Sequence, residues 1–167
     1  AVDGLAGGTC QISTTLHGAA FFAGIEIVGS RVHSRPIPYV DLGLDATVAW
    51  PSTDLKLRNN FPFPVVIRYR VSGNKAYVEI LGKEKIYHQI AFETEELSRT
   101  EPKTVTREDE EIPVGATVHD QIGFPGIKIR RVRRYLDKKG NEVRKPDVWT
   151  VSYRPVTEYI RIGINPD

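Results

Sequence analysis

The chain reads GGTCQISTTLHGAAFFAG at residues 7–24, a stretch that joins a glycine pair, a cysteine and a helical repeat of apolar residues. The apolar residues that recur on one helical face are Ile12, Leu16, Ala19, Ala20 and Ala23. We therefore predict a helix over residues 11–24, with Thr9 as a candidate N-cap and Gly24 as the glycine that ends it. Residues 1–9 form a glycine-rich loop before the helix, so the cysteine lies at the helix start.

Strand patterns dominate the rest of the chain. The predicted strands cover residues 25–28, 45–50, 54–58, 65–71, 75–81, 127–136, 148–153 and 158–162. Ser72-Gly73-Asn74 separates two of them as a hairpin turn. We expect an α+β fold in which one helix, starting at the cysteine, packs on an antiparallel sheet and is followed by a mostly-β C-terminal module.

Residues 93–111 are polar and charged (ETEELSRTEPKTVTREDEE), which is typical of a linker or an exposed edge. This change in composition indicates a domain boundary, and we divide the chain into residues 1–84 and residues 85–167. Within the second part, residues 128–134 (KIRRVRR) form a basic strand with arginines on both faces. We expect it to be a solvated strand paired with the acidic residues 108–111, with attraction to an anionic polymer as the alternative.

The composition argues against several classes of protein. The net charge of +2 comes from 23 basic and 21 acidic residues, a balance that gives no reason to expect nucleic acid as a partner. No apolar run approaches the roughly 18 residues needed to cross a bilayer. A single cysteine excludes an internal disulfide, no cluster of residues has metal-ligand spacing, and the glycine loop lacks the ending of a phosphate-binding loop. We expect neither a metal nor a cofactor.

Because the chain starts at Ala1 and has no Met, we also expect a fragment or a processed product.

Cys10 is the candidate nucleophile. A cysteine attacks as the thiolate, and a free pKa of about 8.5 leaves little thiolate at neutral pH. A helix N-terminus lowers that pKa because its N–H groups and the macrodipole favour negative charge. Gly8 leaves room for the backbone of a substrate, and Gln11 adds a side-chain donor. The alternative is a buried, inert cysteine behind an ordinary glycine turn.

His33 is the candidate base. His17 lies on nearly the same helical face as Cys10 but about 10 Å further along the axis, beyond hydrogen-bond reach. A chain that returns over the helix can place His33 beside the thiol. Asp45, at the start of a predicted strand, is our choice for the carboxylate that orients the imidazole. The rivals for that role are Asp41 and Asp54.

Arg31 and Arg35 flank His33. Paired guanidinium groups suit a substrate that bears a carboxylate, such as a peptide, whereas the alternative is a solvated basic loop. His88 and His119 belong to the second part of the chain, and we expect them to be structural or exposed.

Several segments of the first half, over roughly residues 1–82, closely resemble a known family. They are Gly7-Gly-Thr-Cys-Gln-Ile-Ser-Thr-Thr-Leu16, His33-Ser-Arg-Pro36, Tyr39-Val40, Gly43-Leu-Asp-Ala-Thr-Val48, and Asp54-Leu-Lys-Leu-Arg-Asn-Asn60 with Pro64-Val65. The family is that of VanW-like domains, named for an accessory protein of vancomycin-resistance clusters. Its members are exported wall proteins, and some are reported to act as L,D-transpeptidases. The resemblance implies Cys10 as nucleophile and His33 as base; Asp45 is our extension from the residues themselves.

One departure from the family pattern concerns the N-terminus. VanW-like domains usually have a further segment before the cysteine that contains phenylalanine and asparagine, and this chain lacks it. We therefore expect that a partner chain or a missing N-terminal segment completes the domain.

The second part of the chain is similar to the five-glycine wall-associated module that often follows a VanW-like domain. The residues that carry this looser similarity are Pro113-Val-Gly115, Gly123-Phe-Pro-Gly126, Gly140, Tyr153-Arg-Pro155 and Ile162-Gly163. The two resemblances together imply cysteine-dependent acyl transfer on peptidoglycan stem peptides, through a thioester, outside the cytoplasm in the cell wall or periplasm. Wall glycan is the second expected partner. The alternative is a non-catalytic wall-binding or structural protein with an inert cysteine.

Overall fold

The computed structural model describes residues 8–166. Within them, one helix, α1 (Thr9–Ala23), is followed only by strands. The strands are β1 (Glu26–Gly29), β2 (Lys56–Arg58), β3 (Val66–Ser72), β4 (Lys75–Leu81), β5 (Gln89–Thr100), β6 (Thr104–Pro113), β7 (Thr117–Gln121), β8 (Gly126–Leu136), β9 (Glu142–Tyr153) and β10 (Glu158–Asn165). Of the glycine-rich loop expected at residues 1–9, only Gly8 and Thr9 lie within the described residues.

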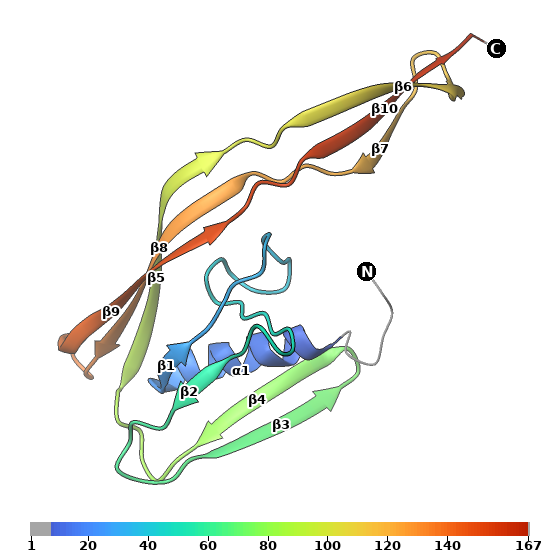
Figure 1. Cartoon of the computed structure of the whole chain (residues 1–167). Coiled ribbons are helices and arrows are strands. Elements are labelled where there is room, and N and C mark those ends of the chain that lie inside the picture. Colours follow the sequence, from blue (N-terminus) through green and yellow to red (C-terminus); the bar gives the residue numbers. More distant parts are fainter. Residues whose placement is uncertain (1–7, 167) are drawn as a thin grey trace.

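The second half of the chain forms a long β-arm (Figure 1). Its lower sheet has the antiparallel order β5-β8-β9, and its upper sheet has the order β6-β10-β7, in which β10 pairs with β6 in parallel and with β7 antiparallel. The strand pairing changes between the two sheets, where Phe124 and Val156 form an isolated bridge. Gly126 lies at this crossing, and a Cβ there would meet the Pro155 ring at 2.7 Å.

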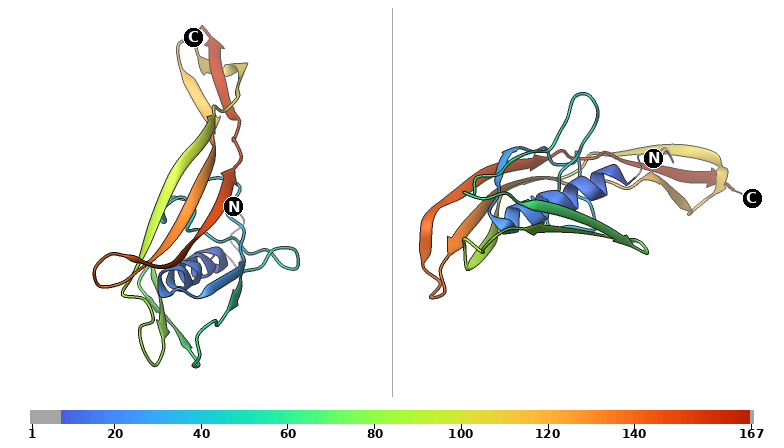
Figure 2. Two further views of the ribbon diagram at one scale, coloured as in Figure 1. Left: turned by 90° about the vertical axis from the view of Figure 1, so that its left-hand side faces the viewer. Right: turned by 90° about the horizontal axis from the view of Figure 1, so that it is seen from below.

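The expected fold class is wrong in its central feature. No single antiparallel sheet lies under the helix in the described residues, and the residues in strands far outnumber the 15 residues of the helix. The helix lies instead between the two-stranded β3–β4 hairpin and the lower sheet of the arm, with the small β1–β2 pair beside it (Figures 1 and 2). The sequence pattern predicted β1, β2, β3 and β4, but a short strand pattern does not specify which strands share a sheet.

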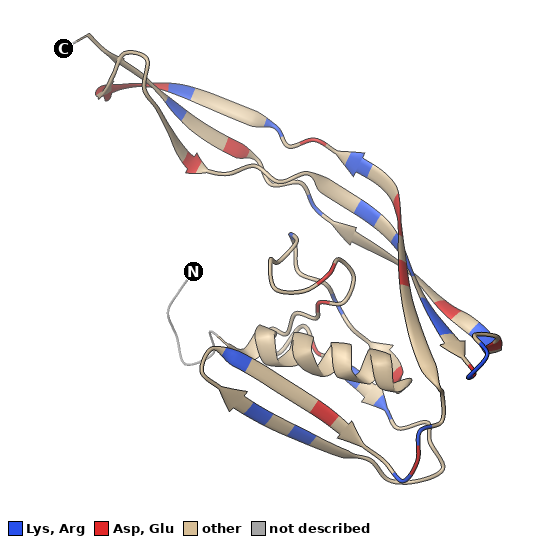
Figure 3. Cartoon of the chain, turned by 180° about the vertical axis from the view of Figure 1, so that it is seen from behind, with Lys and Arg blue, Asp and Glu red and all other residues tan. Residues whose placement is uncertain are grey.

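Helix α1 contains no Lys, Arg, Asp or Glu and is drawn entirely in tan in Figure 3, whereas the strands around it carry charged residues. Phe21 is fully buried and packs edge-on against Phe92 of β5, at 5.5 Å between ring centroids. Gly24 ends the helix in the left-handed conformation (φ 80°), as predicted. Arg133 of β8 donates to the carbonyl oxygens of Phe21 and Ile25, at 3.3 and 2.9 Å, and so places a positive charge at the helix C-terminus. No helix in the described residues is both long enough and apolar enough to cross a membrane.

Residues 93–111 are not a linker; they form the exposed edge that was the other expectation from their composition. They belong to β5 and β6, which are joined by a short turn. The acidic residues of β5 instead pair across the sheet: Glu93 with Arg134 at 2.9 Å, and Glu95 with Arg130. The charged composition therefore reflects a row of exposed cross-strand ion pairs between β5 and β8. The expected pairing of the basic strand with residues 108–111 is likewise replaced by pairing with β5.

The basic strand β8 has the predicted two faces, but only one is solvated. Arg130 and Arg134 are on the open face, whereas Arg131 and Arg133 are each only 2% exposed beneath the helix. Arg133 forms an ion pair with Asp147 of β9 at 2.7 Å. Arg131 stacks on Trp149, at 4.4 Å from its guanidinium carbon to the ring centroid. Buried arginines thus join the helix to the arm.

The strand predicted at residues 45–50 does not form, apart from an isolated bridge between Ala49 and Thr53. At Ala46, the backbone hydrogen bonds go to helix side chains instead. The Thr14 hydroxyl accepts from the Ala46 N–H (3.1 Å) and donates to the Ala46 carbonyl (3.2 Å), and Ser13 donates to the same carbonyl at 2.5 Å. Two hydroxyls thus take the place of a neighbouring strand and hold residues 44–48 against the first turns of α1.

Candidate active site

Cys10 is the second residue of helix α1. Gly8 is the N-cap, not Thr9 as predicted, and it offers no side-chain acceptor to the first N–H groups of the helix. These N–H groups have no intrahelical acceptor, so the helix start favours a negative charge on the cysteine. Cys10 is partly exposed and its thiol is free.

The Cys10 thiol faces the segment that Ser13 and Thr14 hold in place. It lies 3.5 Å from the Thr47 hydroxyl and donates to the carbonyl of Val48, also at 3.5 Å. Burial raises the pKa of this thiol. Hydrogen bonding at the Val48 backbone and Thr47, together with the hydrogen bond and charge of His33, outweighs burial, so the net pKa lies below its ordinary value.

His33 lies beside Cys10 and is held by Asp45. The Asp45 carboxylate oxygen Oδ2 accepts from His33 Nδ1 at 2.8 Å and from the His33 backbone N–H at 2.7 Å. The side chain of His33 is 18% exposed and that of Asp45 is 2% exposed. Because the carboxylate engages Nδ1, the other ring nitrogen is the one left to exchange a proton with the thiol. The structure therefore brings together Cys10, His33 and Asp45, and it does so with Asp45 and not its rivals.

The second oxygen of Asp45 is bound by a residue from the far half of the chain. The Tyr153 hydroxyl of β9 donates to Asp45 Oδ1 at 2.5 Å and accepts from the Gly43 N–H at 2.7 Å. Burial, followed by the hydrogen bond to Asp45, raises the pKa of Tyr153, so this hydroxyl keeps its proton at neutral pH. Both Asp45 oxygens thus have donors, as a buried carboxylate requires.

Tyr39 lies at the rim of the site and is half-exposed. Burial raises the pKa of its hydroxyl, a hydrogen bond with Thr14 lowers it, and the charges of Cys10 and Asp45 raise it. Its hydroxyl therefore lies close to Thr14 and within the electrostatic influence of Cys10 and Asp45, although the sequence assigned it no role.

The four expected substrate-binding residues differ in their surroundings. Gly8 is exposed at the helix start, and Gln11 is half-buried one residue after the thiol. Arg31 and Arg35 are exposed on the loop that carries His33. The guanidinium carbon of Arg35 lies 5.8 Å from the centroid of the Phe124 ring, so this side chain makes a cation–π contact with the arm.

His17 is buried and separate from the thiol, as its position along the helix predicted. Its Nδ1 is 2.7 Å from the Leu44 carbonyl, which can only accept, so this nitrogen carries the proton. Its Nε2 accepts from Arg131 at 3.4 Å. Burial, and then the charge of Arg131, lowers the pKa of His17 to about 4, so the ring stays neutral. His88 and His119 are exposed, and the described residues hold no group of three potential metal ligands.

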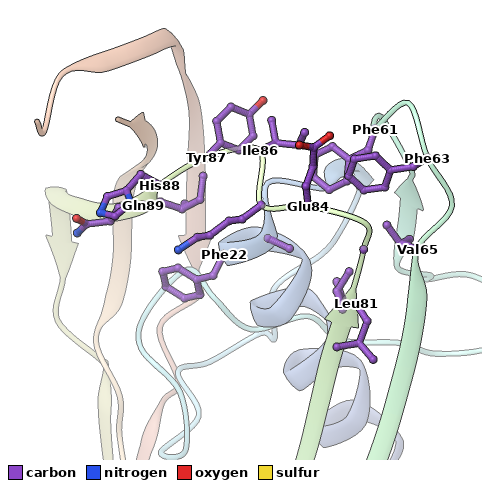
Figure 4. A pocket seen from close by; sticks show the side chains of 15 residues that line it. Phe22, Phe61, Phe63, Val65, Leu81, Glu84, Ile86, Tyr87, His88 and Gln89 are labelled. Carbon is purple, nitrogen blue, oxygen red and sulfur yellow. The ribbon is translucent and has the colours of Figure 1, made fainter. Parts of the chain in front are cut away.

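A separate hollow of about 560 Å³ lies at the opposite end of the helix. Figure 4 shows Phe61 and Phe63 together on one wall, with Phe22 and Tyr87 on the others. Cys10 is at the start of the 15-residue helix and Phe22 near its end, so about 18 Å of helix separates the two. The hollow is therefore not part of the site around the thiol.

Four residues of the site escaped the sequence analysis: Thr47, Val48, Tyr39 and Tyr153. The first two lie just after Asp45, in a segment that was expected to be a strand, so no contact with the thiol could be anticipated. Tyr39 belongs to the Tyr39-Val40 family motif, which by itself indicates no contact with the thiol. Tyr153 is 108 residues from Asp45 in the chain, and no local pattern links the two.

Comparisons with known proteins bear on the first half of the chain. Residues 1–81 match the family model described as VanW like protein. The uncharacterized protein YoaR of Bacillus subtilis (strain 168) is 37% identical over 84 residues, which cover 50% of this chain and 28% of that protein. The chain thus spans little more than a quarter of the length of this relative. The predicted resemblance to VanW-like proteins is confirmed.

Two solved G5 structures are similar to part of the chain. The G5 domain of an IgA1 protease matches 46% of this chain and 92% of its own length, at 19% identity and a TM-score of 0.28. The HP0197-G5 structure matches 45% of this chain and 99% of its own length, at 14% identity and a TM-score of 0.25. At such TM-scores the likeness carries no conclusion about function.

Proposed function

We propose that this chain, with its VanW-like first half, catalyses cysteine-dependent acyl transfer on peptidoglycan stem peptides outside the cytoplasm. The observation that supports this most is the line Cys10–His33–Asp45: a thiol with a lowered pKa at a helix start, next to an imidazole whose other nitrogen is 2.8 Å from a buried carboxylate. This is the arrangement that nucleophilic acyl transfer needs.

In the first half-reaction, the Cys10 thiolate attacks the carbonyl carbon of a stem-peptide amide, and the imidazolium of His33 protonates the departing amine. The C–N bond breaks, a C–S bond forms, and a thioester links the stem to Cys10. In the second half-reaction, His33 takes a proton from the amine of a neighbouring stem, which attacks the thioester. The new amide forms and Cys10 is released as the thiolate.

The other residues around the thiol fit this scheme. Asp45 keeps the imidazole in one orientation and stabilises its charged form. Arg31 and Arg35 are exposed next to His33 and offer guanidinium groups to the carboxylate of a stem peptide. The free N–H groups of the first helical turn offer donors to the negatively charged oxygen of the tetrahedral intermediate. Partial exposure of Cys10 also favours an enzyme over a protein with a sealed, inert cysteine.

The test is to incubate the full chain with purified muropeptide tetrapeptides and to follow cross-linked products and the intact-protein mass. We expect a thioester adduct on Cys10, no product from Cys10→Ala, and at least about a hundredfold loss in His33→Ala. The matched control is His88→Ala, because His88 is exposed and remote from the thiol; it should behave as the wild type. Equal turnover of Cys10→Ala and wild type would exclude the proposal.

A further inference from the structure

The arm reaches into the segment that carries Asp45. A buried cluster on β8 and β9 consists of Ile127, Ile129, Val151 and Tyr153, and Val32 and Leu42 of the first half pack against it. Val32 immediately precedes His33. The residue before the candidate base is therefore anchored in the apolar core of the arm and not in the core around the helix.

The same strands bind both sides of the peptide at Gly43. Its N–H donates to the Tyr153 hydroxyl at 2.7 Å, and its carbonyl accepts from the buried Arg131 guanidinium. Two residues later, Asp45 Oδ1 accepts from the same Tyr153 hydroxyl at 2.5 Å. One hydroxyl from β9 thus fixes both the backbone before Asp45 and the carboxylate itself.

The loop after His33 also lies against the arm. The Ser34 carbonyl accepts from the Arg154 N–H at 2.9 Å, and Arg35 leans on the ring of Phe124. Phe124 is fixed in turn by its bridge to Val156. His33 is therefore held from the arm on both sides in sequence, as well as through Asp45.

We propose that the C-terminal arm is part of the active centre, and that Tyr153 is a positioning residue which holds Asp45, and through it His33, in line with Cys10. The inference rests on the proposed function, because it assumes that His33 acts on the Cys10 thiol. It adds that residues beyond the VanW-like half are needed for that action. The titratable or charged groups that interact with this line are Tyr39, Tyr153, Arg131 and His17.

The experiment measures the rate of Cys10 alkylation by iodoacetamide as a function of pH, on the full chain. His33 raises the reactivity of the thiol at low pH by stabilising the thiolate. In Tyr153→Phe, which removes the hydroxyl but keeps the ring, we expect the profile to move to higher pH and the rate at pH 6 to fall about tenfold, as for loss of one hydrogen bond to a charged group. His33→Ala should move the profile in the same direction and further.

The matched control is Tyr135→Phe. The Tyr135 hydroxyl on β8 donates to Asp147 Oδ2 at 2.5 Å, so the chain offers a second tyrosine–aspartate bond of the same length, with a buried tyrosine and a partly exposed carboxylate. Tyr135→Phe should lower the thermal stability as much as Tyr153→Phe does, yet leave the alkylation profile unchanged. A loss of stability alone therefore does not account for a shift of the alkylation profile to higher pH.

Three outcomes are decisive. If Tyr153→Phe and His33→Ala both move the profile, and the double variant reacts no more slowly than His33→Ala, then Tyr153 acts through His33. If His33→Ala moves the profile but Tyr153→Phe matches Tyr135→Phe, the inference is wrong and the proposed function stands. If His33→Ala leaves the profile unchanged, the proposed function itself is wrong and the inference goes with it.

A second variant covers the case in which Tyr153→Phe does not fold, as judged by circular dichroism. Phe124→Leu removes the ring beneath Arg35 and leaves the buried cluster intact. It should move the alkylation profile in the same direction by a smaller factor. A profile identical to that of the wild type would then overturn the positioning of His33 by the arm.

Discussion

Acidification should destabilise this protein through His17 in particular. The pKa of His17 is lowered from 6.5 to about 4, first by burial and then by the charge of Arg131. The unfolded chain therefore binds a proton between these two values that the folded chain does not bind. The stabilisation is complete above pH 6.5 and is lost as the pH falls toward 4. Each pH unit corresponds to 1.36 kcal/mol, so the loss is about 2 kcal/mol at pH 5 and about 3 kcal/mol at pH 4.

The assay is urea unfolding at several pH values from 7.5 to 4.5, followed by circular dichroism for the wild type and for His17→Gln. Carboxylates titrate in both proteins, so their contribution cancels in the difference of unfolding free energies. At pH 7.5 the variant should be the less stable protein, because a hydrogen bond to the Leu44 carbonyl is perturbed. The difference should shrink by about 2 kcal/mol on going to pH 5. His88→Gln, at an exposed position, should parallel the wild type; if His17→Gln also runs parallel to it, the burial argument is refuted.

Three further predictions concern stability and are measured by urea unfolding at pH 7. Gly24→Ala should cost at least about 1 kcal/mol because the residue has φ 80°, and an unchanged midpoint would contradict the left-handed helix end. Phe21→Ala should cost about 3–5 kcal/mol, whereas Phe22→Ala, at a side chain 49% exposed, should cost clearly less; equal losses would disprove the packing described. Arg133→Met, which breaks a largely buried ion pair, should cost about 3 kcal/mol, and Arg134→Met on the exposed face less than about 1 kcal/mol; the reverse order would show that β8 faces the other way.

Local sequence patterns predicted the helix, its terminal glycine and the β3–β4 hairpin, because each depends on residues close together in the chain. The helix begins two residues earlier than predicted, since Gly8 caps it and Thr9 is already helical. The candidate line of Cys10, His33 and Asp45 was also anticipated, from the chemistry of the residue types and from family resemblance. Their roles remain proposals.

The failures share one physical cause, which is that partners distant in sequence decided the outcome. Residues 93–111 have the composition of a loop, yet form strands because Arg130 and Arg134 supply opposite charges across the sheet. Residues 45–50 have the pattern of a strand, yet bind Ser13 and Thr14 instead of another strand. The sequence close to these residues does not indicate these distant partners.

The parallel pairing of β10 with β6 has a mechanical consequence. Residues 158–163 of β10 are in unbroken register with residues 104–109 of β6. When tension is applied at the far end of β10 and resisted at the helix, it therefore loads all of these hydrogen bonds together in shear. They do not break one after another from one end. Rupture then depends on the rate at which the whole ladder slips, so the arm should yield under force much more slowly than the two-stranded β3–β4 hairpin pulled apart from its open end.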